Sequence, residues 1–543
     1  MVLKRIKAEK TLDLDEARVK YPHLDRYLKE LEDKGITPDW YQELNRNLIN
    51  IENINIIYPV GDPIFIHLYK DPEIGFVYHV IEPRMSDRQK KVYDQILDKM
   101  IEIAGLMPVP KSEEEVEKIL IDLLNEVVSV EKPPVFGEKI VVSREDYEMY
   151  RYYIVRDRIG YGKLTPLFFD SWLEDIHCVG VGSVKVVHKI FGTCHTNIIF
   201  EDDIELNKYI LETSERVEKP ASSRHSVVDA IMPDGSRVNF IYGRDISLEG
   251  SSFTIRKFFE VPVSVTQLID WGTLSAREAA YLWIAIEFGM NIFVCGETAA
   301  GKTTTLNALA AFIVPEAKVY SVENTPEVKM PHEIWQHLVT REQGKASDVT
   351  YQDLLIAALR SRPNYIIVGE IRGVEGNIAF QAMQTGHPVM STFHAGSVES
   401  LVQRLTGVPI NVPIASIDNL NIVVIQSAVR RGNRSLRRVI SITEIERYYA
   451  PENKVITRQV FKWDPASDEH IFQGMYNSFI LEKKIGTMMG LADTREIYKL
   501  LHIREKILLE MVKNKIFDYY EVWRVLKLYR HGGLAALPFP VIV

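Results

Sequence analysis

Short apolar runs alternate with helical stretches from about residue 267 to residue 450 of the chain. Five runs have the apolar and β-branched composition of buried strands, namely residues 291–295, 318–322, 365–368, 388–392 and 422–429. Strands that alternate with helices in this way form a parallel sheet with helices on its faces. The pattern therefore predicts a doubly wound α/β domain whose ligands bind at the carboxyl ends of the strands.

The preceding part of the chain shows two other patterns. Up to about residue 135, helical periodicity surrounds one hairpin, predicted from strand-like runs at 64–69 and 76–81. One helix begins after Ser86, which has Gln89 in capping-box spacing, and another begins after Ser112. From about residue 140 to 257, a helix followed by short strands predicts a small α/β domain.

Prolines and glycines suggest where these parts are joined. A Pro-Pro pair at 133–134 predicts a linker over 131–137, and Pro262 lies in a short hinge over 258–266. We expect four regions: a mainly helical adaptor domain over 1–135 that binds partners, an α/β domain over 140–257, the hinge over 258–266, and the doubly wound domain over 267–543 with a helical extension at 478–530.

One loop in the doubly wound domain has the spacing of a phosphate-binding motif. A strand-like run leads into Gly296-x-x-x-x-Gly301-Lys302-Thr303, and a helix follows. In such P-loops the backbone N–H groups and the helix N-terminus surround a phosphate, Lys302 reaches the β- and γ-phosphates, and Thr303 holds Mg²⁺. The predicted contacts are Gly296, Glu297, Thr298, Ala299, Ala300, Gly301, Lys302, Thr303 and Thr304. The chain is predicted to bind a nucleoside triphosphate.

Acidic residues follow two other strands. Glu370 comes after an apolar strand, but the position before it, where an Asp normally holds Mg²⁺, is Gly369. Taken alone, that glycine favours a nucleotide-binding scaffold that does not hydrolyse its ligand. Glu323 and Glu327 follow another strand and are candidates to polarise water or complete the metal shell; the alternative is an ordinary acidic loop.

Two histidines bracket the strand at residues 388–392. His387 precedes this strand and His394 follows it. A neutral imidazole near a γ-phosphate donates a hydrogen bond and so senses whether that phosphate is present. A single histidine is more often structural, but two beside a P-loop favour a functional role.

Composition limits the partners and the location of the chain. The net charge is −9 and the pI is about 5.9, which disfavours binding to nucleic acid through bulk charge. No apolar run approaches the length of a membrane-spanning helix, and the three separated cysteines are expected to be reduced core residues of a cytoplasmic protein. The basic positions Lys4, Arg5, Lys7 and Lys10 form either a solvated tail or a contact with anionic membrane lipid.

These motifs together resemble those of the secretion-ATPase superfamily, which drives type II secretion, type IV pili and related conjugation systems. Gly296–Thr303 matches Walker A, Glu323–Glu327 matches the acidic "Asp box" with Asn324 in place of a frequent Asp, and the segments ending at Gly373 and His394 match the Walker B and His boxes. The resemblance implies a RecA-like ATPase domain with a PAS-like α/β domain before it. It also implies that Gly369 is normal for the family and that the chain hydrolyses ATP with Mg²⁺ held by Thr303 and Glu370.

The resemblance further implies that arginines of the α/β domain complete the nucleotide site when subunits close into a ring. Arg237 and Arg256 match the family in this respect, and Arg224 and Arg244 match less well. A guanidinium stabilises charge that develops on the transferred phosphoryl group.

Other segments are similar to the archaeal branch of the superfamily, and within it to the motor ATPase of the archaellum, the swimming filament of archaea. They include residues 160–167, 411–413, 517–522 and 537–540. The similarity implies a cytoplasmic homo-hexamer at the inner face of the cell membrane, docked on a polytopic membrane platform protein and other archaellum motor components. The alternatives are an ATPase of an archaeal pilus, secretion or conjugation system, a nucleotide-gated scaffold, and a RecA-like helicase.

Overall fold

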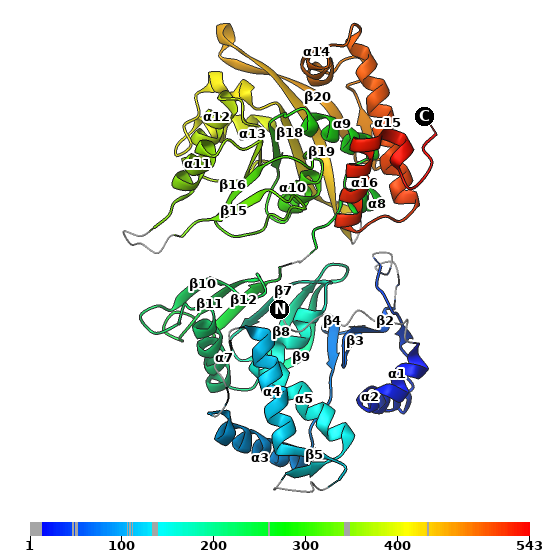
Figure 1. The fold of residues 1–543 in the computed structure, drawn as a ribbon, viewed down its shortest axis with the longest axis vertical. Helices are drawn as coiled ribbons and strands as arrows, with labels where there is room; N and C mark the ends of the chain where they lie inside the picture. Colours follow the sequence, from blue (N-terminus) through cyan, green and yellow to red (C-terminus); the bar gives the residue numbers. More distant parts are fainter. Residues whose placement is uncertain are drawn as a thin grey trace. The chain divides into compact units, whose positions relative to one another are not determined.

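The structure is a computed structural model that describes residues 13–45, 48, 51, 53–105, 107, 110, 112–132, 139–258, 261–341, 348–431 and 434–542. Contacts divide the chain into two compact units, and the boundary between them lies between residues 259 and 260. We call them the N-terminal unit and the C-terminal unit (Figure 1). Within the described ranges, no helix is both long enough and apolar enough to cross a membrane.

Three predictions fall wholly or partly on residues outside those ranges. They concern the basic positions Lys4, Arg5, Lys7 and Lys10, the linker residues 133–137, and the hinge residues Phe259 and Glu260.

The N-terminal unit is built on one ten-stranded sheet. In spatial order its strands are β1 (Asp39–Trp40), β2 (Asn55–Gly61), β3 (Ile64–Asp71), β4 (Gly75–Ile81), β9 (Gly192–Phe200), β8 (Gly182–His188), β7 (Leu173–Val179), β12 (Ser252–Arg256), β11 (Arg237–Ile241) and β10 (Val227–Ile231). Its helices are α1 (Leu14–Lys20), α2 (Pro22–Glu32), α3 (Asp87–Ala104), α4 (Glu113–Val127), α5 (Arg144–Arg158), α6 (Thr165–Phe169) and α7 (Asp203–Arg216). A small parallel pair, β5 (Val128–Val130) and β6 (Ile140–Val142), lies beside α4 and α5.

The predicted hairpin is confirmed, but it does not belong to a separate adaptor domain. Strand β4 pairs in parallel with β9, with Val77 opposite His195, so the hairpin extends the sheet of the later strands. One hydrophobic core contains both Tyr78 of the hairpin and Phe240 of the later strands. Within the described residues, the structure therefore has no domain boundary near residue 135 of the kind expected between the adaptor domain and the α/β domain. The reason is that the outer edge of β4 forms its backbone hydrogen bonds with β9.

The helices of the first 135 residues begin where their caps predicted. Ser86 and Gln89 form the capping box of α3, and Ser112 accepts a hydrogen bond from the backbone N–H of Glu115 at the start of α4. These two helices share a small core of their own with α5, which includes Ile96 and Leu124. Local capping chemistry was therefore enough to locate the helices, whereas the sheet pairing needed a distant partner.

Acid should destabilise the N-terminal unit through its buried histidines. Burial lowers the pKa of His67, His79 and His188 to about 4 from an ordinary value of 6.5. These side chains are neutral when folded, so their contribution to stability is complete above pH 6.5 and is lost as the pH falls toward 4. We expect the denaturant midpoint to fall over this interval and to fall less in His67→Gln; equal slopes for the two proteins would contradict this.

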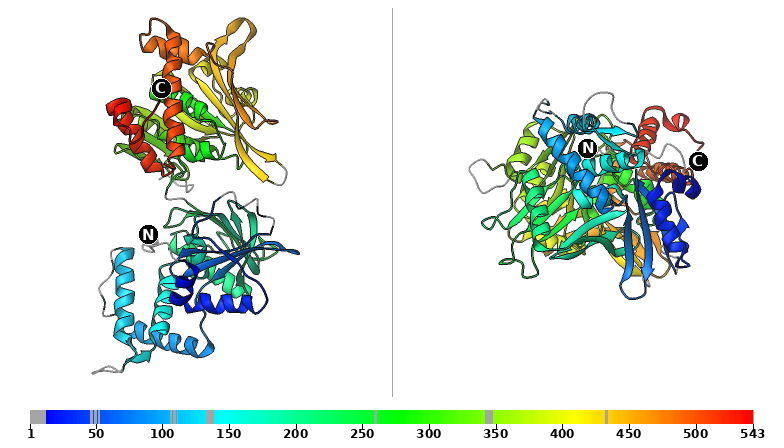
Figure 2. Two further views of the ribbon diagram at one scale, coloured as in Figure 1. Left: turned by 90° about the vertical axis from the view of Figure 1, so that its right-hand side faces the viewer. Right: turned by 90° about the horizontal axis from the view of Figure 1, so that it is seen from below.

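The C-terminal unit contains a nine-stranded sheet. In spatial order its strands are β15 (Trp335–Val339), β14 (Val319–Glu323), β16 (Tyr365–Ile371), β17 (Val389–Phe393), β13 (Ile292–Cys295), β18 (Ile422–Arg431), β19 (Arg434–Tyr449), β20 (Lys454–Asp464) and β21 (Glu469–Phe472). The first six are parallel, and β18 to β21 are antiparallel to one another. These antiparallel strands, yellow to orange, extend beyond the rest of the unit (Figure 2).

Helices cover both faces of this sheet, as the alternation predicted. They are α8 (Val265–Asp270), α9 (Ala276–Glu287), α10 (Lys302–Ala310), α11 (Tyr351–Arg360), α12 (Glu375–Gln384), α13 (Val398–Thr406), α14 (Gly486–Met488), α15 (Ile497–Lys513) and α16 (Tyr519–Gly532). Successive residues of β13 enter different cores, since Val294 packs with α9 and α10, whereas Phe293 packs with α12. The doubly wound α/β prediction is confirmed, and so are helices in the region 478–530.

Candidate active site

The predicted P-loop connects the carboxyl end of β13 to α10. Gly301 adopts the left-handed region at φ 91°, and a Cβ on Gly296 would lie 2.2 Å from the backbone oxygen of Gln426. Glycine is therefore required at both positions for the loop to turn under β18. No side chain of the described chain caps the first turn of α10, so its N–H groups and the positive end of its dipole face the loop. The loop is a cradle for an anion.

Lys302 lies at the centre of this cradle. Its side chain is buried, and Nζ donates a hydrogen bond to the backbone oxygen of Glu297 at 3.0 Å. The half-buried Thr303 and Thr304 follow on the first turn of α10. Thr298, Ala299 and Ala300 complete the loop, and Ala299 is left-handed at φ 62°. All nine predicted loop residues are thus together in one local structure.

Glu370 reaches the same edge of the sheet from β16. The register between β16 and β17 shifts at Gly369, and the bulged carbonyl there accepts a hydrogen bond from the hydroxyl of Thr392 at 2.6 Å. The carboxylate of Glu370 is partly exposed, with Oε1 2.8 Å from Nε2 of His394 and Oε2 accepting from Nε of Arg372 at 2.6 Å. The bulge aims a carboxylate with accessible surface toward the carboxyl ends of the strands.

Glu323 is buried and serves a different purpose. Its Oε1 accepts hydrogen bonds from the backbone N–H groups of Glu327 at 2.9 Å and Val328 at 2.8 Å, and its Oε2 lies 2.6 Å from Nε2 of His337. Both carboxylate oxygens therefore hold the following loop and β15 in place. A Cβ on Gly369 would lie 2.9 Å from Cγ of Glu323, which explains why the position before Glu370 is a glycine in this chain.

We expect Gly369→Asp to destabilise the protein and not to supply a metal ligand. The new Cβ would collide with Glu323, whose carboxylate is fixed, and such overpacking costs about 1–3 kcal/mol. Thermal unfolding and phosphate release from ATP measure the two effects. Gly396→Ala is the control, because its Cβ would meet only Oε1 of Glu297, at 3.9 Å. A Gly369→Asp protein with normal stability and activity would contradict the packing argument.

Glu327 lies in a segment that is attached to the P-loop helix. Asn307 of α10 donates to the backbone oxygen of Glu327 at 2.8 Å and accepts from the backbone N–H of Lys329 at 3.2 Å. Tyr519 of α16 donates from its buried hydroxyl to the backbone oxygen of Asn307 at 3.2 Å. The acidic segment, the P-loop helix and the C-terminal extension are therefore joined by buried hydrogen bonds.

The structure brings only one of the two predicted histidines to this edge. His394 follows β17 and contacts Glu370; burial, and then the positive charge of Lys302, lower its pKa below the ordinary 6.5. His387 precedes β17, and its Nδ1 lies 3.1 Å from the hydroxyl of Thr385. Because β17 is parallel to β13, a residue before it lies at the opposite, amino edge of the sheet. The structure therefore does not bring His387 to the edge that carries the P-loop, and a catalytic role for His387 stays a prediction.

The predicted arginines belong to the N-terminal unit, where two of them are neighbours. Arg237 of β11 and Arg256 of β12 are exposed and directly opposite each other in the antiparallel register. Nε of Arg237 donates to Oδ1 of Asp229 at 3.0 Å. Of the two weaker candidates, Arg244 pairs with Asp203 and Arg224 is exposed. Because each unit is described by itself, the role of these arginines at a nucleotide remains a proposal.

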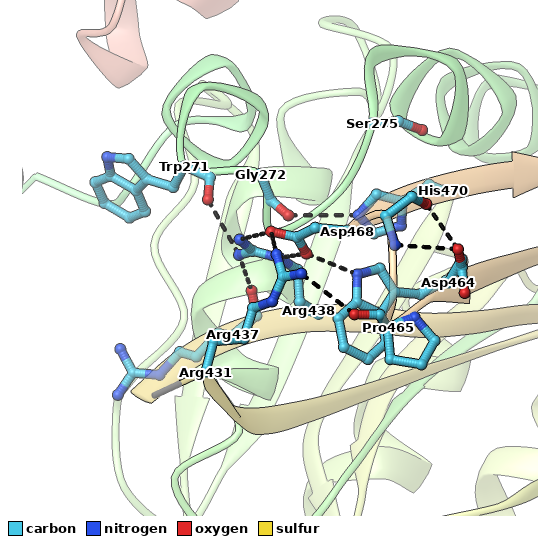
Figure 3. Close-up of polar contacts among 12 residues, drawn as sticks. Trp271, Gly272, Ser275, Arg431, Arg437, Arg438, Asp464, Pro465, Asp468 and His470 are labelled. Atoms are coloured by element: carbon cyan, nitrogen blue, oxygen red, sulfur yellow. Dashed lines mark hydrogen bonds and ion pairs between the residues drawn. The ribbon is translucent and has the colours of Figure 1, made fainter. Parts of the chain in front are cut away.

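A residue that the sequence analysis missed lies against the P-loop. Nε of Arg437, on β19, donates to the backbone oxygen of Ala299 at 3.2 Å, and its Cδ would be 3.1 Å from a Cβ on Gly301. Next to it in sequence, the buried Arg438 binds Asp468 at 2.9 and 3.0 Å and donates to the backbone oxygen of Trp271 (Figure 3). The hydrogen bond from Arg438 holds the pKa of Asp468 well below its usual range. The sequence signal that could have found Arg437 is a pair of adjacent arginines inside a strand. Adjacent side chains of a strand point to opposite faces of the sheet, so the two arginines cannot have the same surroundings.

Comparison with known proteins gives the following matches. The family described as Type II/IV secretion system protein matches residues 183–477. MJ0900, an uncharacterized protein of Methanocaldococcus jannaschii, is 50% identical over 545 residues, which cover 97% of this chain and 98% of that protein. The type IV secretion system protein PtlH of Bordetella pertussis is 33% identical over 176 residues, 30% of this chain and 52% of PtlH. The ATPase DotB of Legionella pneumophila aligns at 17% identity and a TM-score of 0.37, covering 65% of this chain and 91% of DotB.

Proposed function

Because the chain belongs to the type II/IV secretion system protein family, we propose that it is an ATP-hydrolysing motor that works as a homo-hexamer. The observation that carries the proposal is the arrangement at one sheet edge. The P-loop after β13, His394 after β17 and Glu370 of β16 come from three adjacent parallel strands. Ligands bind at this edge in such sheets.

The residues of this edge match what hydrolysis of a triphosphate requires. The glycine cradle and the first turn of α10 accept the phosphates, and Lys302 carries the compensating positive charge. A hydroxyl from Thr303 and a carboxylate from Glu370 are oxygen donors of the kind that Mg²⁺ prefers, and the bound metal neutralises charge on the phosphates. Glu370 orients the attacking water, and His394 donates a hydrogen bond that depends on the γ-phosphate. Arg437 steadies the loop from β19.

We assign Arg237 and Arg256 to the nucleotide site of a neighbouring subunit. Their cross-strand pairing on an exposed surface of the N-terminal unit supports this role, since it puts two guanidinium groups side by side. Such groups stabilise transition-state charge when a partner supplies them. A ring of subunits that closes and opens around ATP would couple hydrolysis to motion between the two units.

The machine we propose is the archaellum, with the motor on the inner face of the membrane, docked on a polytopic platform protein. The resemblance of residues 517–522 and 537–540 to that branch supports this choice. The second candidate is a pilus, secretion or conjugation motor, which the similarity to PtlH favours. Chromosomal Lys302→Ala in the native organism decides between them: loss of archaella with pili intact supports the first, and loss of pili or secretion with swimming intact overturns it.

The enzymatic part is tested by inorganic phosphate release from ATP and Mg²⁺ with the purified full chain. Turnover that disappears on chelation of Mg²⁺ supports an ATPase. Binding of ATP without turnover would support a nucleotide-gated scaffold instead. Stimulation by DNA would favour a helicase, which the net charge of −9 disfavours.

A further inference from the structure

Ala299 in the P-loop has a backbone conformation that alanine does not favour. Its φ is 62°, in the left-handed region, where the Cβ of any residue except glycine approaches the following carbonyl oxygen. A residue stays in such a region because neighbouring groups fix its backbone. Here the backbone oxygen of Ala299 accepts the hydrogen bond from Nε of Arg437 at 3.2 Å. Arg437 therefore holds a strained part of the phosphate cradle.

The segment of β19 that carries Arg437 is bonded to the turn that follows α8. The backbone N–H of Val439 donates to the oxygen of Thr273 at 2.7 Å, and Nη1 of Arg438 donates to the oxygen of Trp271 at 3.1 Å. The same Nη1 also donates to the backbone oxygen of Arg437 at 2.9 Å. One guanidinium thus holds both the turn and the backbone of the residue that contacts the P-loop.

Asp468, in the connection between β20 and β21, fixes the orientation of that guanidinium. Its two carboxylate oxygens accept from Nε and Nη2 of Arg438 at 2.9 and 3.0 Å, which uses the planar fork of the arginine side chain (Figure 3). The Arg438 side chain is 8% exposed, so the pair is largely shielded from water. Nε1 of Trp463 also donates to Oδ1 of Asp468, at 2.9 Å. With the fork fixed in this way, Nη1 is left to reach the backbone oxygens of Trp271 and Arg437.

We propose that Arg438 and its anchor Asp468 are positioning residues for the phosphate cradle, which they join through Arg437 to the turn at residues 271–273. The inference rests on the proposed function, in which this cradle holds the phosphates of ATP. The two adjacent arginines divide the work because their side chains point to opposite faces of the sheet. Arg437 contacts the loop, and Arg438 fixes the strand from which Arg437 extends. Because coupling between two sites is reciprocal, a nucleotide in the cradle also steadies the turn.

Hydrogen exchange of the ligand-free full chain tests the restraint directly. Asn at position 468 keeps the size of the side chain but offers Arg438 one oxygen instead of two and carries no charge. In Asp468→Asn we therefore expect amide exchange over residues 297–301 to become at least about fivefold faster, within the range by which coupled positions act. Unchanged exchange over this segment overturns the proposal.

Two controls separate the restraint from a general loss of stability. Arg431→Gln is the matched variant, because Arg431 contacts the same carboxylate at 2.8 Å, and among the described residues it has no contact with the P-loop or the 271–273 turn. It should exchange like the unmodified chain. Helix α12 packs in the other core of the unit and is the internal reference. Faster exchange of the same size over α12 in Asp468→Asn would show general destabilisation and overturn the proposal.

A double-mutant cycle tests whether Asp468 acts through Arg437. Asp468→Asn and Arg437→Gln should each raise the Kd of N-methylanthraniloyl-ATP at least about fivefold. The double variant should raise it no further, whereas effects that multiply would overturn the proposal. Arg438→Lys should match Asp468→Asn, because an ammonium lacks the fork that bonds the carboxylate and both backbone oxygens together. This variant provides the same test if Asp468→Asn does not fold.

The same measurements separate this inference from the proposed function. Saturating nucleotide should slow exchange over residues 271–273 in the unmodified chain but not in Asp468→Asn, and no slowing in the unmodified chain overturns the link to the turn. If the unmodified chain releases no phosphate from ATP but Asp468→Asn still loosens the P-loop, the proposed motor fails and the positioning role stands. If phosphate is released and the P-loop is not loosened, the positioning role fails and the motor stands.

Discussion

Lys302→Ala should lower ATP turnover by at least about a hundredfold, since a positioned donor at a developing charge contributes that much. The side chain is buried in the P-loop, and its ammonium lies within hydrogen-bond distance of the backbone oxygen of Glu297. Alanine removes the only side-chain cation that the P-loop itself carries. The cradle glycines and the N-terminus of α10 remain, so weakened nucleotide binding is expected to persist.

The measurement is steady-state phosphate release together with thermal unfolding. Truncating a buried lysine removes little apolar packing, so the unfolding temperature should stay close to that of the unmodified chain. Lys454→Ala is the matched control, because Lys454 is an exposed lysine of the same unit that pairs only with Glu452 in the structure described. Turnover like that of the unmodified chain in folded Lys302→Ala would overturn the assignment of the P-loop as the catalytic site.

Local patterns predicted the elements of the fold well, and long-range pairing limited the rest. The alternation of apolar runs identified five of the six parallel strands, because a strand buried on both faces has to be apolar throughout. The edge strand β15 was missed, since none of its residues is fully buried. Strand β2 was missed because Pro59 interrupts its run, and the pairing of β4 with β9 depends on residues more than a hundred positions apart. The antiparallel strands β19 to β21 were also missed, since their exposed positions carry charged residues such as Lys462.

The candidate site was predictable where a motif fixes the backbone. The P-loop spacing determined β13, the cradle and α10 together, because its glycines are required by the turn. The roles of individual side chains were harder to predict from the sequence. The sequence left open whether Glu323 or Glu370 is the base. It already put His387 and His394 at opposite ends of one strand, although the prediction treated both as candidates near the phosphate. Arg437 went unnoticed because its partner, the backbone oxygen of Ala299, belongs to a segment more than a hundred residues away.

Glu370→Gln should reduce ATP turnover by about 10²–10⁴-fold, the usual contribution of a general base, while ATP still binds. Glutamine keeps the size of the side chain and an oxygen for a metal, but it cannot take a proton from water. Binding of a fluorescent ATP analogue and phosphate release measure the two quantities separately. A raised Kd with unchanged turnover at saturation would show that Glu370 only helps to bind the nucleotide.

Glu323→Gln is the matched comparison, and the surroundings of the two carboxylates predict that it behaves differently. Glutamine at 323 retains one oxygen for the backbone N–H groups of Glu327 and Val328, but loses the negative charge beside Nε2 of His337. We therefore expect lower stability with most of the turnover retained, since neither oxygen of Glu323 is free to accept a proton from water. The carboxylate of Glu370 also has two partners, His394 and Arg372, but it is partly exposed at the sheet edge. It can therefore exchange a partner for water more easily than the buried carboxylate of Glu323 can. If Glu323→Gln instead abolished turnover without loss of stability, Glu323 would be the base, and Glu370 would serve mainly to hold the metal.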